Sequence, residues 1–119
     1  MTEKEFLDRL SAEQKVMISR IRAWIAELDG PSEVAVGSSM GTDMLMLNVN
    51  GECKYGFTVG KLLTFHNWVM YCHPEIHAQY ADQLGLPKSR VKKSCLNLLS
   101  TDEFDESAFK AMIGAGAVF

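Results

Sequence analysis

The sequence predicts an α+β domain, in which a sheet of about five mainly antiparallel strands is flanked by helices. Two short turn signals, Asn50-Gly51 and Gly60-Lys61, each lie between apolar runs, as in consecutive β-hairpins. An amphipathic helix is expected before them, because Met17, Ile21, Trp24, Ile25 and Leu28 recur at helical spacing. With 119 residues, 47% of them hydrophobic, the chain suits a single α+β domain over residues 1–119.

The first two segments are predicted to be helices that begin with capping boxes. Thr2 is followed three residues later by Glu5, and Ser11 is followed by Gln14 at the same spacing. The second helix carries the apolar stripe. It is expected to end at Asp29-Gly30-Pro31, because glycine favours the helix terminus and proline cannot continue the helix.

Four strands are predicted next, over residues 33–39, 42–49, 52–59 and 62–72. Two-residue turns would place Val49 opposite Glu52 and Tyr55 opposite His66. In that register one face gathers Met44, Met46, Tyr55, Phe57, His66, Trp68 and Met70. We expect the helix that contains Trp24 to cover this face. The other face is also largely apolar, so both are expected to be covered at least in part.

The remaining elements are predicted to be a helix, a strand and a closing helix. Pro74 suits the first position of a helix, which Gly85 would end. The segment CLNLLS at residues 95–100 is expected to form the last strand. Asp105 is the expected N-cap of the final helix.

All three histidines lie in one segment, FHNWVMYCHPEIH, at residues 65–77. A shared metal would need three or four ligands that converge on one point. Pro74 takes His73 out of the helix, and His66 points into the sheet face, so we predict no metal and no cofactor. His66 is instead expected to be a half-buried side chain that forms a hydrogen bond beside Tyr55.

Cys72 provides an alternative site in the same segment. It precedes a helix N-terminus and is followed by His73, and both features can lower the pKa of a thiol. A small enzyme that uses a reactive Cys72–His73 corner is therefore one alternative function.

Charge and cysteine content exclude several classes of function. The net charge of −3 gives no basic excess, so no nucleic-acid partner is expected. No apolar run approaches the ~18 residues of a membrane span, and the charged N-terminus does not resemble a signal peptide. The three cysteines are widely spaced, which favours reduced thiols in the cytoplasm.

Four segments carry a resemblance to a known family: NGECKYGFTVGK, LLTFHNWVMYC, QLG at a helix end, and RVKKSCLNLLSTDEFDESAFKAMI. Their order resembles that of small bacterial YdhG-like proteins of the domain-of-unknown-function type, over residues 12–113. The resemblance implies a frataxin-like fold, a sheet flanked by helices. Since some members are regarded as iron chaperones, it also implies iron binding or delivery as an alternative function. Acids on the first helices would then be the ligands: Glu3, Glu5, Asp8, Glu13 and Glu27.

The favoured function is that of a non-enzymatic cytoplasmic binding module for a small molecule, a metal ion or a protein partner. The candidate ligand site is the predicted sheet face with Met44, Met46, Tyr55, His66, Trp68 and Met70. Methionines adapt to the shape of a ligand, and Tyr55 and His66 can form hydrogen bonds with it. Whether this face is a pocket or plain core stays open at this point, as does the oligomeric state, a homodimer included.

Overall fold

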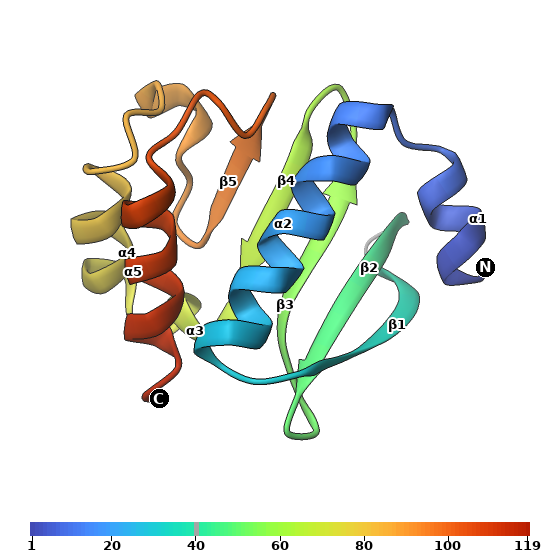
Figure 1. Cartoon of the computed structure of the whole chain (residues 1–119), viewed down its shortest axis with the longest axis horizontal. Helices are drawn as coiled ribbons and strands as arrows, with labels where there is room; N and C mark the ends of the chain where they lie inside the picture. Colours follow the sequence, from blue (N-terminus) through green and yellow to red (C-terminus); the bar gives the residue numbers. More distant parts are fainter. Residues whose placement is uncertain (40) are drawn as a thin grey trace.

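The structure is a computed structural model that describes residues 1–39 and 41–119. Its elements follow the predicted order, with two short helical segments added (Figure 1). They are α1 (Glu3–Asp8), α2 (Ala12–Leu28), β1 (Ser32–Ser39), β2 (Thr42–Val49), β3 (Glu52–Val59), β4 (Leu63–Asn67), α3 (Trp68–Tyr71), α4 (Pro74–Ala81), η1 (Lys88–Arg90), β5 (Cys95–Leu98) and α5 (Glu106–Gly116).

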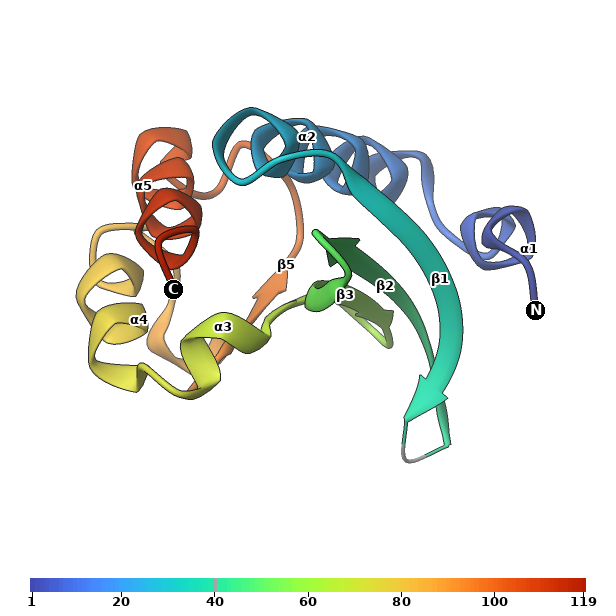
Figure 2. The same ribbon diagram turned by 90° about the horizontal axis from the view of Figure 1, so that it is seen from below.

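The five strands form one sheet in the order β1-β2-β3-β4-β5, and every neighbouring pair is antiparallel. The predicted α+β class is therefore confirmed. Figure 2 shows α2 and α5 on one side of the curved sheet, with α1 beside β1 and α4 next to α5. In the described part of the chain, no helix has the length and hydropathy that a bilayer-spanning segment requires.

The predicted N-termini of α1, α2 and α5 are confirmed by their capping contacts, whereas α4 ends at Ala81 and not at the predicted Gly85. Thr2 and Glu5 form the capping box of α1, and Ser11 and Gln14 form that of α2. The side chain of Asp105 accepts a hydrogen bond from the Ala108 amide at the start of α5. These contacts satisfy amide groups that a helix N-terminus leaves without partners.

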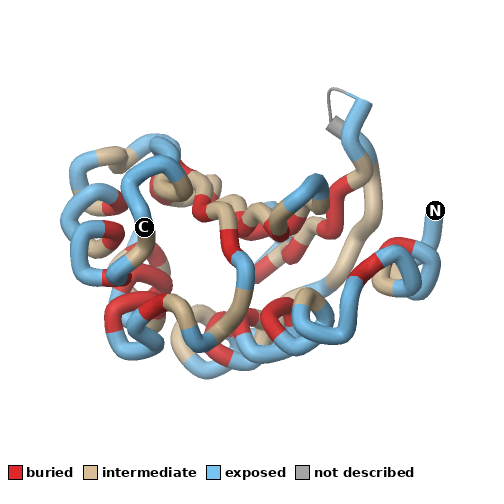
Figure 3. Tube along the Cα trace, turned by 90° about the horizontal axis from the view of Figure 1, so that it is seen from above, coloured by how far each residue is buried: buried red, intermediate tan, exposed pale blue. Residues whose placement is uncertain are grey.

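The hydrophobic core lies between the sheet and the helices α2 and α5. Phe109 of α5 lies at its centre, with ring centroids 5.4 Å from Trp24, 5.2 Å from Phe65 and 5.1 Å from Phe104. Figure 3 shows buried positions, in red, on the helices and on the strands that they cover. The predicted packing of the Trp24 helix over Tyr55 is thus correct, although Trp68 lies on the other face.

The predicted register fails at β3 because of a β-bulge. The Asn50-Gly51 turn has positive φ at both residues, and Val49 pairs with Glu52 as predicted. The register shifts after the next pair, Asn48–Cys53, so that Tyr55 pairs with Leu47 instead of Met46. Lys54 is the additional residue on the bulged strand.

A second shift follows at the next loop. Val59 pairs with Leu63 instead of Leu62, so the loop has three residues, and His66 pairs with Gly56 instead of Tyr55. The predicted Tyr55–His66 pair is therefore wrong, and the two side chains lie on opposite faces. The two shifts cancel between β2 and β4, which leaves the alternate residues of β2, such as Met46, on the same face as His66.

The long strand predicted over residues 62–72 is also wrong. β4 ends at Asn67, and the chain turns into α3, which begins with Trp68. Because a helix does not keep the alternation of a strand, Met70 lies in the core and not on the face of His66.

Candidate functional site

One face of the sheet is open, because α2 and α5 pack only on the other (Figure 2). It is formed by alternate residues of the five strands together with the Trp68 side chain. We name it the open face and define it by Ala35, Met44, Met46, Thr58, Thr64, His66, Trp68, Cys95 and Asn97. Met44 is buried and the others are half-buried. None of these side chains is charged at neutral pH unless His66 is protonated.

Trp68 reaches the open face from the start of α3 because β3 has a glycine beneath it. A Cβ atom built on Gly56 would lie 2.5 Å from Cη2 of Trp68 and 3.0 Å from its Cζ3. The indole ring therefore occupies the space that any other side chain at this position would fill. Its ring centroid lies 5.6 Å from that of His66, with 19° between the two planes.

His66 lies across β4, with one ring nitrogen directed to each neighbouring strand. Nε2 is 2.9 Å from Oγ1 of Thr58 on β3, and Nδ1 is 3.3 Å from Sγ of Cys95 on β5. Burial lowers the pKa of His66, which favours the neutral imidazole at neutral pH. A neutral ring that donates from Nε2 to Thr58 would keep the lone pair of Nδ1 directed at Cys95.

The structure brings together four of the six residues predicted as the ligand site. Met44, Met46, His66 and Trp68 share the open face. Tyr55 and Met70 do not belong to it, because both are buried on the helix side of the sheet.

Tyr55 instead takes part in a buried polar cluster with Asp29 and Lys54. Its hydroxyl donates a hydrogen bond of 2.7 Å to Asp29 Oδ2, and Lys54 Nζ lies 3.1 and 3.2 Å from the two carboxylate oxygens. Burial raises the pKa of Tyr55, and the hydrogen bond to Asp29 raises it further. The predicted role of Tyr55 as a polar group beside His66 is therefore corrected.

The other two histidines lie in environments different from that of His66. His73 is the N-cap of α4, and its ring stacks on Phe119 at a centroid distance of 3.9 Å. His77 is buried, and neither of its ring nitrogens has a hydrogen-bond partner among the described residues. Burial is the main influence on the pKa of His77 and lowers it.

The alternative Cys72–His73 corner lies where α3 passes into α4. Cys72 is exposed, and the His73 ring is engaged with Phe119 at the end of the chain. A reactive corner at this position stays a prediction.

The acids on which the iron alternative depends are partly engaged in ion pairs. Glu3 pairs with Arg22 at 3.0 Å, and Asp8 pairs with Lys4 at 3.0 Å. Within residues 1–39 and 41–119, no three or more His, Cys, Asp or Glu side chains gather as metal ligands would.

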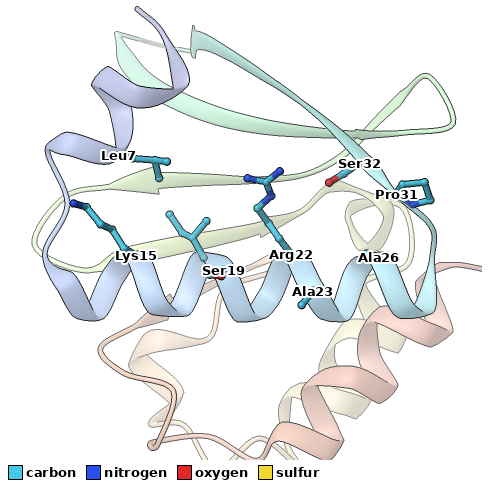
Figure 4. Close-up of a pocket in the computed structure, with 9 residues that line it drawn as sticks. Leu7, Lys15, Ser19, Arg22, Ala23, Ala26, Pro31 and Ser32 are labelled. Carbon is cyan, nitrogen blue, oxygen red and sulfur yellow. The ribbon is translucent and has the colours of Figure 1, made fainter.

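A groove between α1, α2 and β1 has a volume of about 550 Å³ (Figure 4). Arg22 and Lys15 of α2 border it, and Leu7 of α1 forms part of its apolar lining. The Arg22 guanidinium is already paired with Glu3. The groove therefore offers a competing site, with one of its two cations neutralised.

Sequence reasoning missed two residues of the open face that contact His66, namely Thr58 and Cys95. Their positions depend on the register of β3 and on the pairing of β5, and neither is set by local turn chemistry. Gly56 was an available signal, since a glycine inside a strand often marks a bulge or the close approach of another group.

Replacing Gly56 with alanine tests the packing of Trp68. The new methyl group would overlap the indole ring, so we expect a loss of about 1–3 kcal/mol in the free energy of unfolding. The tryptophan fluorescence of the chain, to which Trp24 also contributes, should shift to the red as the Trp68 ring is displaced into water. Gly60→Ala is the control, because a methyl group added there would have no atom within 4 Å, and its stability should change by less than about 0.5 kcal/mol. Equal stability of the two variants would contradict the packing of Trp68 on Gly56.

Comparison of the chain with protein-family models, curated proteins and solved structures found no match in any of the three. The site is therefore interpreted from its own geometry.

Proposed function

We propose that this chain is a small binding protein and that its ligand lies on the open face. The ligand class that suits this face is a flat, mainly apolar small molecule without a formal charge. The observation that carries the proposal is the Trp68 ring, held against Gly56 beside His66 on a face that the two large helices leave uncovered.

Three properties of the open face support this class of ligand. Aromatic rings favour offset stacking with other flat rings, and Trp68 provides such a surface. Met46, which pairs with Gly56 on the neighbouring strand, is half-buried, and its flexible side chain can adapt to a ligand. Thr64 and Asn97, joined by a 2.7 Å hydrogen bond, border a hollow of about 280 Å³ at one end of the face and provide polar contacts.

The neutral fluorescent probe N-phenyl-1-naphthylamine tests this proposal. We expect its fluorescence to rise on binding to the wild-type protein. Trp68→Ala should weaken binding by about tenfold, the size expected when one aromatic contact is lost. Met46→Ala should weaken it less. Circular dichroism of each variant separates a lost contact from a lost fold.

Two control variants address the competing sites. Ala23→Phe fills the groove between α1 and α2, and Cys72→Ser removes the thiol of the alternative corner. Both should bind the probe as the wild type does. Binding that survives Trp68→Ala but is lost in Ala23→Phe would overturn the proposal and move the site to the groove.

A further inference from the structure

We infer that Cys95 is a nucleophilic thiol and that His66 acts as its general base. The thiol forms covalent adducts with α,β-unsaturated carbonyl compounds on the open face. The reactivity of the thiol does not depend on the proposed function. The preference for flat, conjugated electrophiles does rest on it, because that preference would come from Trp68.

The geometry is that of a nucleophile, a base and a group that orients the base. Cys95 Sγ lies 3.3 Å from Nδ1 of His66, and Nε2 of the same ring lies 2.9 Å from the Thr58 hydroxyl. A nucleophile within hydrogen-bond reach of a base, itself oriented by a third group, is the arrangement that activates a thiol. All three residues lie on paired strands, which hold the arrangement more rigidly than loops would.

The state of the histidine agrees with this role. Burial lowers the pKa of His66, so that at neutral pH the ring is neutral and able to accept a proton. Hydrogen bonding to Thr58 holds the ring across β4, which keeps Nδ1 on the side of Cys95.

The reaction needs no further reactant. The thiol proton passes to Nδ1 of His66 as sulfur attacks the β-carbon of the electrophile. A carbon–sulfur bond forms, the carbon–carbon π bond opens towards the carbonyl, and an enolate results. The imidazolium then returns a proton to the α-carbon, so that the adduct is neutral and His66 regains its starting state.

The chain contains three free cysteines, so that the reactivity of Cys95 can be compared with that of Cys53 and Cys72 in the same molecule. Cys53 and Cys72 are exposed, whereas Cys95 is only partly accessible. If exposure alone governed the rates, Cys95 would react most slowly. We expect the opposite order with N-ethylmaleimide, an α,β-unsaturated imide.

The experiment measures adduct formation at each cysteine by peptide mass spectrometry, with the rates normalised to those of the urea-unfolded chain. Cys95 should react about tenfold faster than Cys53 and Cys72, a modest part of the 10²–10⁴-fold effect typical of acid–base assistance. In His66→Asn that advantage should disappear, and in Thr58→Val it should decrease. A wild-type Cys95 that reacts no faster than the two exposed cysteines would overturn the inference, whatever the variants do.

A second probe separates this inference from the proposed function. N-phenylmaleimide carries a flat ring that N-ethylmaleimide lacks, so Cys95 should prefer it in the wild type and lose the preference in Trp68→Ala. Fast reaction of Cys95 with both probes and no effect of Trp68→Ala would keep the thiol inference and contradict the aromatic contact. Slow reaction with both would contradict the thiol inference, and the naphthylamine titration would still test the binding site.

Discussion

Replacing Asp29 with alanine is expected to lower the free energy of unfolding by about 3–5 kcal/mol, the range for breaking a buried ion pair. The Asp29 side chain is 3% exposed and that of Lys54 is 10% exposed. Without the carboxylate, the Lys54 ammonium stays buried without its counter-charge, and the Tyr55 hydroxyl loses its acceptor. Urea denaturation at pH 7 measures the loss.

Two further variants show whether the effect comes from the buried charge. Adding Lys54→Met to Asp29→Ala should recover a large part of the stability, because the unpaired charge is then removed as well. Asp8→Ala breaks the exposed pair with Lys4 and should cost less than about 1 kcal/mol. A loss in Asp29→Ala as small as that in Asp8→Ala would mean that the cluster is not buried as described.

Replacing Phe109 with alanine should also lower the free energy of unfolding by about 3–5 kcal/mol, the range for a buried phenylalanine. The Phe109 side chain is 0% exposed, and its ring contacts those of Trp24, Phe65 and Phe104. The variant loses the burial of the ring and leaves a cavity where α5 meets α2 and the sheet. Thermal and urea denaturation both report this change.

Phe119 provides a matched control for the same substitution. It is 52% exposed and stacks on His73 at the end of the chain. Phe119→Ala should lower the free energy of unfolding by less than about 1 kcal/mol, because the substitution removes little buried apolar surface. If the two variants lost similar amounts of stability, Phe109 could not be the centre of the core.

The buried Asp29 cluster and the open face depend on the same irregularity of β3. The bulge lets Lys54 and Tyr55 both reach Asp29 on the helix side of the sheet. The strand then continues with Gly56 directed to the other side, where Trp68 covers it next to His66. The same extra residue in β3 therefore sets the position of the stabilising Asp29 cluster on one face and of the proposed site on the other.

Features that depend on neighbours within a few positions could be predicted from the sequence. The capping boxes at Thr2 and Ser11, the turn at Asn50-Gly51 and the cap at Asp105 all follow from groups at most three residues apart. Each satisfies backbone groups locally, so no distant contact is needed to choose it. The α+β class and the order of the elements follow from these signals together with the apolar periodicity.

Features that depend on distant residues were decided only by the tertiary structure. Asp29 and Lys54, which form the buried ion pair, are 25 positions apart in the sequence, and Cys95 and His66 are 29 positions apart. Because side chains alternate between the two faces of a strand, one extra residue at Lys54 was enough to move Tyr55 into the core. Local turn signals determine where strands begin and end, but the face that each side chain joins is set by the partners that it finds across the fold.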